Sequence, residues 1–336
     1  MIELDKIYQG DSLATMKTWP DAFVQTCVTS PPYFGLRDYG HEGQVGQERT
    51  PEAFVSKLVE IFSEVKRILR PDGTLWLNLG DSYNNYAGNR GAGNGISKNT
   101  HQAMQQKPRG YGLSVKNLKN KDLIGIPWMT AFALRSDGWY LRDEIIWAKP
   151  NPMPSSIKDR CTRAHEHIFM FSRSPRYHYD HKAIRTPLKA TSIAQNLDAQ
   201  AGSNRPESKA NGAMKAVCFG GTKKSGEGAE SYTGRTKTGN TWDPGTDPGA
   251  TKRSVWTVTT RPFKGAHFAT FPADLIEPCV LAGAPRGSIV LDPFMGAGTT
   301  GMVAARHGRR YLGCELNPAY VKMADDRITA EILGDL

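Results

Sequence analysis

Two apolar patterns alternate along the chain, and turn residues separate them. Short stretches rich in apolar residues predict strands at 23–28, 74–79, 140–147, 166–171, 287–292 and 310–315, with a further short strand ending at Asp11, and the stretch 74–79 is the continuously apolar one. Apolar residues at helical spacing predict helices that begin at Pro51, near Ile126, at Pro272 and at Thr299. Continuously apolar strands are typical of parallel sheets covered on both faces, so the alternation predicts an α/β fold.

Two polar segments interrupt this alternation. Residues 84–121 are rich in Gly, Asn and Gln and carry seven Lys or Arg with no Asp or Glu. Residues 183–255 carry eleven Lys or Arg against six Asp or Glu, and few of their apolar residues repeat with any period. Neither segment has the composition of an independent core. The second is interpreted either as a polar linker or as a region that recognises a partner.

The positive charge of the chain is concentrated in these two insertions. Together they carry +12, whereas all 336 residues carry +10, so the remaining scaffold has a charge of about −2. Basic charge on loops rather than on a folded core is expected where loops grip phosphates. The charge distribution therefore predicts a polyanionic partner.

The stretch Thr29-Ser30-Pro31-Pro32-Tyr33 follows a predicted buried strand. Two prolines cannot continue a strand ladder, so this segment is rigid and extended at the carboxyl end of the strand, where α/β sheets bind ligands. It offers a hydroxyl group, backbone carbonyls without strand partners and an aromatic face. These groups suit a planar molecule with an NH2 group, although a simple proline turn is the other interpretation.

A second candidate site follows the predicted strand 287–292. A glycine-containing turn connects Asp292 to a helix that begins at Thr299, and the next predicted strand ends in Glu315. Glycines let a ligand approach the backbone, the helix N-terminus favours negative charge, and Glu315 is placed to accept hydrogen bonds from two ribose hydroxyls. The spacing is not that of a P-loop.

Together these motifs resemble those of the DNA amino-methyltransferases. The segment from Asp292 to Gly298 is similar to their S-adenosylmethionine loop, and Ser30 to Tyr33 is similar to their (Asp/Asn/Ser)-Pro-Pro-(Tyr/Phe) motif. The catalytic motif precedes the cofactor loop by about 260 residues, which is the permuted order of the β group of that family. The resemblance implies a Rossmann-like, mostly parallel seven-stranded methyltransferase sheet with helices on both faces and polar DNA-recognition insertions.

The resemblance also implies a domain organisation. Residues 1–182 and 256–336 would form the catalytic domain, with 84–121 as an inserted basic loop, and 183–255 would be the target-recognition region. The DNA-binding residues expected on the loops are Arg37, Arg90, Lys98, Lys107, Arg109, Lys223, Lys224 and Arg235.

Site residues are carried over by the same resemblance. Ser30, Pro31, Pro32 and Tyr33 would be catalytic. The cofactor, S-adenosyl-L-methionine, would be held by Asp11, Phe268, Thr270, Asp292, Pro293, Phe294, Gly296, Gly298, Thr299, Thr300 and Glu315. Asp11 would accept from the adenine amine, although an acidic residue in a helix-initiating turn is the other interpretation, with Ser12 expected as the cap. Phe268 and Thr270 could also belong to a simple helix entry.

The expected reaction is transfer of a methyl group to the exocyclic amine of a flipped base. Ser in the first position of the motif favours cytosine N4 over adenine N6. Methylation at cytosine C5 would require a Pro-Cys nucleophile, and the only Pro-Cys, Pro278-Cys279, falls in a predicted packing helix. The alternatives are methylation of RNA or of a protein glutamine, and a non-catalytic DNA-binding module.

The remaining composition adds little chemistry. The five cysteines, Cys27, Cys161, Cys218, Cys279 and Cys314, include no Cys-x-x-Cys pair, so reduced thiols without zinc are expected. His165 and His167 have no further ligand at metal-binding spacing, and no metal is expected. The chain is expected to be cytoplasmic and associated with the nucleoid through double-stranded DNA. A homodimer and a cognate restriction endonuclease are compatible with the resemblance, and the sequence leaves both open.

Overall fold

The computed structural model describes residues 2–36, 41, 43–84, 115, 117–187, 249–260 and 270–334. Its elements follow in the order β1 (Lys6–Gln9), α1 (Ser12–Lys17), β2 (Val24–Thr29), α2 (Pro51–Ile68), β3 (Leu69–Leu79), α3 (Ile126–Ser136), β4 (Tyr140–Ala148), β5 (His165–Ser172), β6 (Val255–Thr257), α5 (Ala273–Gly283), β7 (Ile289–Asp292), α6 (Thr299–Arg306), β8 (Arg310–Glu315) and α7 (Pro318–Leu333).

The strands form one sheet in the order β1-β8-β7-β2-β3-β5-β4-β6. All neighbours are parallel except β5, which runs antiparallel to both β3 and β4. The predicted α/β fold with a mostly parallel sheet is confirmed. The predicted count of seven strands is wrong, because the short strand β6 pairs with the outer edge of β4 through Val255–Thr257 and adds an eighth.

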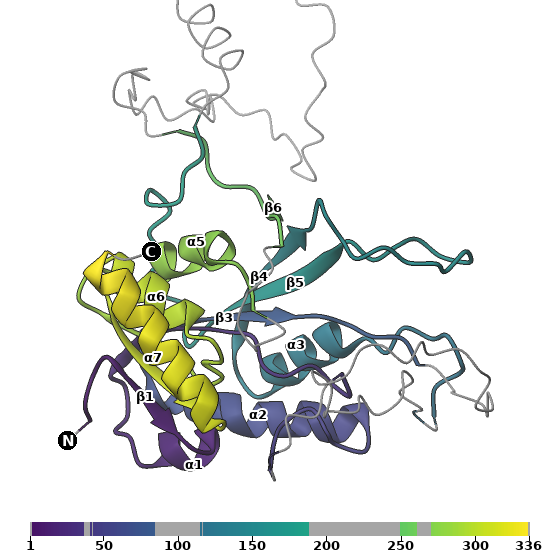
Figure 1. The fold of residues 1–336 in the computed structure, drawn as a ribbon, viewed down its shortest axis with the longest axis horizontal. Helices are drawn as coiled ribbons and strands as arrows, with labels where there is room; N and C mark the ends of the chain where they lie inside the picture. The colour runs from purple at the N-terminus through teal and green to yellow at the C-terminus, as the bar shows by residue number, and fades with distance from the viewer. Residues whose placement is uncertain are drawn as a thin grey trace, which may run out of the picture. The chain divides into compact units, whose positions relative to one another are not determined.

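Helices cover both faces of the sheet (Figure 1). On one face α1, α2 and α3 bury a core that includes Met16, Phe54, Phe62 and Leu134. On the other face α5, α6 and α7 bury a second core that includes Leu275, Val303 and Ile328. Strand β2 and residues 73–79 of β3 are buried on both sides, which explains why apolar residues dominate these stretches of the sequence.

All the predicted strands and helices are present, and the largest difference in bounds is at the start of β3. The helix that begins at Pro51 ends at Ile68, and the chain enters β3 directly at Leu69, whereas the sequence predicts the strand only from residue 74. Helix α7 was not predicted. Its buried residues are Ala324 and Ile328 only, so its apolar pattern is weak, and its end is set by Gly334 with φ 78°.

The order of the strands creates a switch point at the centre of the sheet. From β2 the chain continues to β3 on one side, whereas from β7 it continues to β8 on the other. In open α/β sheets the crevice at the carboxyl ends of two such strands is where ligands bind. Because β5 is antiparallel, its first residues lie at this same edge: Leu79 pairs with His167, and Trp147 pairs with Glu166.

Residues Arg185–Thr251 form a separate unit, of which the structure describes only the two ends. Thr186 and Ala250 form an antiparallel bridge there. In the described parts of the chain, no helix is long and apolar enough to cross a membrane.

Candidate active site

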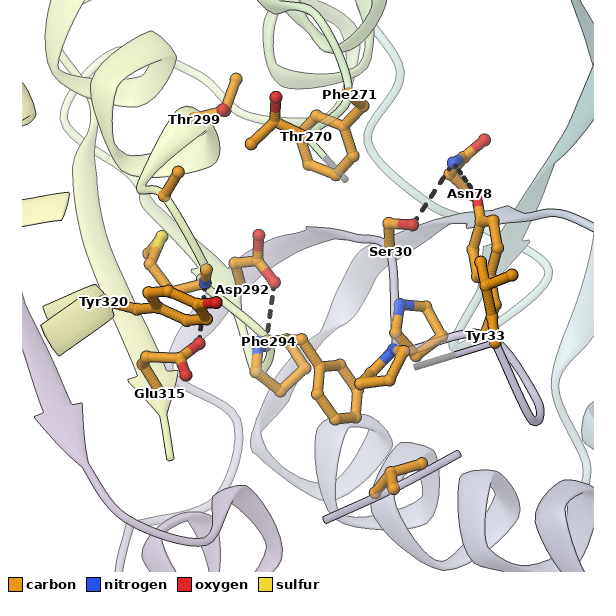
Figure 2. Close-up of a pocket in the computed structure, with 18 of the residues that line it drawn as sticks. Ser30, Tyr33, Asn78, Thr270, Phe271, Asp292, Phe294, Thr299, Glu315 and Tyr320 are labelled. Atoms are coloured by element: carbon orange, nitrogen blue, oxygen red, sulfur yellow. Dashed lines mark hydrogen bonds between the residues drawn. The ribbon is translucent and has the colours of Figure 1, made fainter. Parts of the chain in front are cut away.

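A cavity of about 730 Å³ opens at the carboxyl ends of β2 and β7. Its lining includes the segment that follows β2, the turn that follows β7, the end of β8 and residues from β3, β4 and β5. Figure 2 shows Ser30, Tyr33 and Asn78 on one side and Glu315 and Tyr320 on the other, with Asp292 between them. The two predicted motifs, far apart in sequence, therefore line a single cavity.

The predicted catalytic residues Ser30, Pro31, Pro32 and Tyr33 all line this cavity. The chain leaves β2 at Thr29 because the two prolines that follow Ser30 cannot donate ladder bonds. The Ser30 Oγ accepts a hydrogen bond of 3.3 Å from Asn78 Nδ2 on the neighbouring strand β3. The hydrogen bond from Asn78 thus orients the serine hydroxyl in the absence of a ligand.

Tyr33 is held at its hydroxyl by a polar cluster of Asn78, Lys149 and Glu166. Its OH donates to Glu166 Oε2 at 2.7 Å and accepts from Asn78 Nδ2 at 3.0 Å. Lys149 Nζ pairs with the other oxygen of Glu166, and this ion pair is mostly buried. Burial, followed by the nearby Glu166 carboxylate, raises the pKa of Tyr33 well above its ordinary value, so the phenol stays protonated as a donor.

The orientation of the Asn78 amide follows from its neighbours. Asn78 is 4% exposed, and its Nδ2 also donates to Glu166 Oε2 at 3.1 Å, while its Oδ1 has no hydrogen-bond partner. A carboxylate only accepts hydrogen bonds, so Glu166 requires the amide nitrogen, not the oxygen, to face the cluster. An unpaired buried carbonyl costs free energy, and the two N–H groups of Nδ2, shared among Ser30, Tyr33 and Glu166, offset that cost.

A backbone contact fixes the ring of Tyr33 from behind. Gly80 directly follows β3, and a Cβ atom built on it would lie 2.5 Å from Tyr33 Cε2. Any larger residue at position 80 would displace the ring. The aromatic face of Tyr33 is therefore set by Gly80 and by the hydrogen bonds at the phenol oxygen.

On the other side of the cavity, Asp292 organises the turn that follows β7. Its carboxylate accepts from Thr29 Oγ1 at 2.6 Å, from Phe294 N at 3.0 Å and from Thr300 Oγ1 at 2.7 Å. Burial of this 1% exposed side chain raises its pKa to about 6 despite these donors. Asp292 thus connects β2, the turn and α6 through hydrogen bonds. These bonds fix the position of one motif relative to the other.

Glu315 lies across the cavity from Ser30 (Figure 2). Its Oε2 accepts from Gly296 N at 2.9 Å and its Oε1 accepts from Asn317 N at 2.8 Å. Burial raises the pKa of this carboxyl group, and the backbone donors oppose that shift. A carboxylate oxygen can accept a second bond, so both oxygens remain suited to ligand hydroxyls.

The other predicted cofactor residues divide into three groups. Asp11, Thr270, Pro293, Phe294, Gly296 and Thr299 line the cavity. Gly298 and Thr300 support it from outside: Gly298, with φ 78°, leaves room for Ala324 of α7, and Thr300 Oγ1 donates to Val28 O at 3.2 Å. Phe268 lies outside the described residues.

Asp11 caps α1 in addition to lining the cavity. Its Oδ1 accepts from Ala14 N at 2.7 Å, so the expectation that Ser12 is the cap is wrong. A carboxylate places two oxygens at the helix N-terminus, where a hydroxyl would place only one. The helix-cap interpretation of Asp11 is thus correct, and it leaves a ligand contact possible through the other oxygen.

Two negative expectations concern residues elsewhere. No group of three or more His, Cys, Asp or Glu that could hold a metal occurs among the described residues, and His167 Nδ1 instead contacts Glu144 Oε1 at 2.7 Å. Cys279 lies in α5, is 1% exposed and has its pKa raised by burial, so it is unsuited to be a nucleophile.

The predicted DNA contacts all fall outside the described residues. These are Arg37, Arg90, Lys98, Lys107, Arg109, Lys223, Lys224 and Arg235.

Sequence reasoning missed the polar cluster and one aromatic wall of the cavity. Asn78, Lys149, Glu166 and Tyr320 all line it. One signal was available, because Asn78 is a polar residue in an otherwise apolar run, and a buried polar side chain needs partners. No comparable signal marks Lys149 or Glu166, which come together only because β5 is antiparallel to its neighbours.

A family model and the relatives found by sequence comparison indicate the same protein family. The family model described as DNA methylase, for N6 and N4 methyltransferases, matches residues 24–326. The type II methyltransferase M.Cfr9I of Citrobacter freundii is 42% identical over 325 residues, which cover 97% of this chain and 88% of that protein. M.XycI of Xanthomonas campestris pv. cyanopsidis is 43% identical over 325 residues, with the same coverage of 97% and 88%.

Solved structures share the fold at lower identity. The PvuII DNA methyltransferase, described as cytosine-N4-specific, aligns with a TM-score of 0.57 at 17% identity and covers 97% of this chain and 90% of that one. A DNA modification methylase of Thermus thermophilus, TTHA0409, described as putative and solved in complex with S-adenosyl-L-methionine, aligns with a TM-score of 0.56 at 22% identity and coverage of 98% and 95%.

Proposed function

Because this chain belongs to the N6/N4 DNA methylases, a family of S-adenosylmethionine-dependent DNA amino-methyltransferases, we propose that it methylates a flipped base, with cytosine N4 favoured over adenine N6. Family membership confirms the predicted enzyme class, DNA as the substrate and S-adenosyl-L-methionine as the cofactor. One observation carries the finer proposal: Ser30 and Glu315 line one cavity, so a reacting amine and a bound cofactor would meet there.

The residues on the Glu315 side fit the cofactor. Glu315 would accept from the ribose hydroxyls, Asp11 from the adenine amine, and the turn 292–298 would follow the methionine end. Phe294 and Tyr320 add aromatic walls to the same part of the cavity. When bound, S-adenosylmethionine supplies an electrophilic methyl group on its sulfonium centre.

On the other side, Ser30 and Pro31 would activate the amine. The lone pair of an exocyclic amine is delocalised into the base ring, which makes it a poor nucleophile. Hydrogen bonds from the NH2 group to Ser30 Oγ and to the Pro31 carbonyl would localise that lone pair toward the methyl group. The transfer would then be an in-line displacement assisted by positioning and electrostatics, and the methylated amine would release its extra proton to solvent.

Tyr33 would present the stacking surface for the base. A base within a duplex cannot reach this cavity, so it must be flipped out before reaction. The hydroxyl of Tyr33 is occupied by Asn78 and Glu166, and its ring is backed by Gly80. Such a ring is ordered in advance, which lowers the entropic cost of holding the base.

The two polar insertions would supply most contacts with DNA. Their net charge of +12 supports phosphate binding by 84–121 and target recognition by 183–255. The separation of Arg185–Thr251 as a unit is compatible with the second role. We further propose that the enzyme acts in the cytoplasm, with the permuted motif order of the β group, as the modification partner of a restriction endonuclease.

The test is methyl transfer by the purified protein. Labelled S-adenosylmethionine would be offered with duplex DNA, RNA and protein, and the modified nucleosides would be separated by mass. The expected product is N4-methylcytosine in duplex DNA. N6-methyladenine would overturn the base preference alone, whereas label in RNA or protein only would overturn the proposal. Sequencing of modified bases in DNA from an expressing host would give the recognition site.

A further inference from the structure

The loop between β4 and β5 displays an exposed methionine at the rim of the cavity. Met153 lines the cavity and is 87% exposed, more than any other large apolar side chain of the described residues. Burial of a methionine side chain stabilises a protein, so a chain that leaves one exposed forgoes that stabilisation. Leu36 is a second exposed apolar residue of the lining, at 52%.

Several contacts hold the loop that carries Met153. At its base, Asn151 Nδ2 donates to Thr260 O at 3.0 Å, and Thr260 N donates back to Asn151 Oδ1 at 3.0 Å. Farther along, the Arg160 guanidinium lies 3.6 Å from the ring centroid of Tyr83, and Lys121 pairs with Asp159 at 2.6 Å. The loop is thus tied to the catalytic domain at both ends.

The sequence of the loop restricts its backbone as well. Prolines occupy positions 150, 152 and 154, on both sides of Met153, and each fixes its own φ. The residue before a proline is also restricted to extended conformations, which applies to Met153 itself. The methionine is therefore presented by a stiff segment.

The charge of the loop fits a DNA partner. Residues 150–164, beyond the mostly buried Lys149, contain three Lys or Arg and one Asp. A basic segment with an exposed apolar residue combines the two features that architectural DNA-binding proteins use, phosphate contact and insertion of an apolar side chain between bases.

We propose that Met153 enters the duplex as a wedge at the position that the target base leaves. Its side chain packs against the neighbouring bases and fills the vacated space, while the base occupies the cavity beside Tyr33. Unstacking and unpairing a base costs free energy, and apolar contact at the gap offsets part of that cost. This inference rests on the proposed transfer to a flipped base.

The test compares Met153→Ala with wild-type enzyme on two duplexes. Both contain the methylated site identified by sequencing, and in the second the target base faces an abasic position. On the paired duplex, Met153→Ala should lower the single-turnover rate at least about tenfold, since the variant must bear the opening cost alone. On the abasic duplex, where no pair has to break, the two rates should agree within about twofold.

Three further variants serve as controls for the effect of Met153→Ala. Met153→Leu keeps the apolar bulk and should recover most of the rate on the paired duplex. Ile157→Ala removes an apolar side chain from the same loop that is 43% exposed and does not line the cavity, and should match wild type on both duplexes. Leu36→Ala tests the other exposed apolar residue of the lining and should leave the ratio of the two rates unchanged. Equal thermal midpoints for all variants would show intact folding.

Each contrary result has a defined meaning. A wild-type rate for Met153→Ala on the paired duplex, or an equal loss on both duplexes, overturns the wedge. The same holds if Leu36→Ala, and not Met153→Ala, shows loss on the paired duplex alone. Failure of the proposed function is distinct, because the wild-type enzyme itself would then methylate no amine on either duplex.

Discussion

The two sides of the cavity are built in different ways. On the Glu315 side, the carboxylates of Asp292 and Glu315 accept mainly from backbone N–H groups and threonine hydroxyls within two neighbouring segments. On the Ser30 side, the polar cluster consists of side chains from distant parts of the chain that bond to one another. The first arrangement depends on local backbone geometry, and the second depends on tertiary packing.

The two sides of the cavity should therefore respond differently to single substitutions. A backbone donor survives most substitutions, so removing the Glu315 carboxylate should weaken ligand binding without disturbing the neighbouring residues. In the polar cluster one atom serves several partners, as Asn78 Nδ2 does, so a single change should propagate.

Ser30→Ala should lower the single-turnover rate of methyl transfer by about 100-fold, which corresponds to about 2.7 kcal/mol. The lost hydrogen bond matters most as charge develops on the amine, so affinities for cofactor and DNA should stay within about twofold. Rapid-quench kinetics and titration calorimetry would measure the two quantities. A variant with the wild-type single-turnover rate would remove Ser30 from the reaction.

Asp292→Asn tests the buried carboxylate that joins the two sides. The pKa of Asp292 is raised to about 6, so the folded state holds this proton more tightly than the unfolded state does. Its contribution to stability is therefore fully present below about pH 4 and is lost as the pH rises to about 6, by up to roughly 3 kcal/mol.

Urea denaturation at pH 4, 5, 6 and 7 would show this as a difference between wild type and Asp292→Asn. The wild-type free energy of unfolding should fall relative to that of the variant as the pH rises. If the difference between the two proteins is constant across this range, the carboxyl group does not titrate there.

Glu315→Ala should weaken S-adenosylmethionine binding by about 1–3 kcal/mol, because the ribose hydroxyls lose an acceptor. Gly296 N and Asn317 N would lose their partner too, and water can replace it at this partly exposed site. Calorimetry measures the affinity, and circular dichroism controls for folding. Unchanged affinity in a folded variant would place the cofactor elsewhere.

Glu166→Gln should lower kcat by about 10-fold with little change in KM, since a neutral amide orients Tyr33 and Asn78 less firmly than a carboxylate. The matched variant is Tyr33→Phe, which keeps the ring and removes the hydroxyl that contacts Glu166. If Glu166 acts through that hydroxyl, the two substitutions together should cost less than the sum of the single effects. Strict additivity would show that the two residues act independently.

The sequence alone determined the local features of this protein. Apolar runs marked β2, β3, β7 and β8 because parallel strands between two helical layers must be apolar on both faces. Prolines and glycines marked the segments that follow β2 and β7, because these residues restrict or extend the allowed backbone angles within a few positions. These signals were enough to place Ser30, Asp292 and Glu315 at strand ends.

Which side chains come together in the cavity depends on the tertiary structure. The antiparallel direction of β5 brings Glu166 to Asn78, and the loop after β4 brings Lys149 to both. No spacing rule relates positions 33, 78, 149 and 166, because strand order and direction are set by how the whole sheet packs between its helices. The short strand β6 and the weakly apolar helix α7 were hidden for the same reason: the contacts that stabilise each of them come from elements already folded.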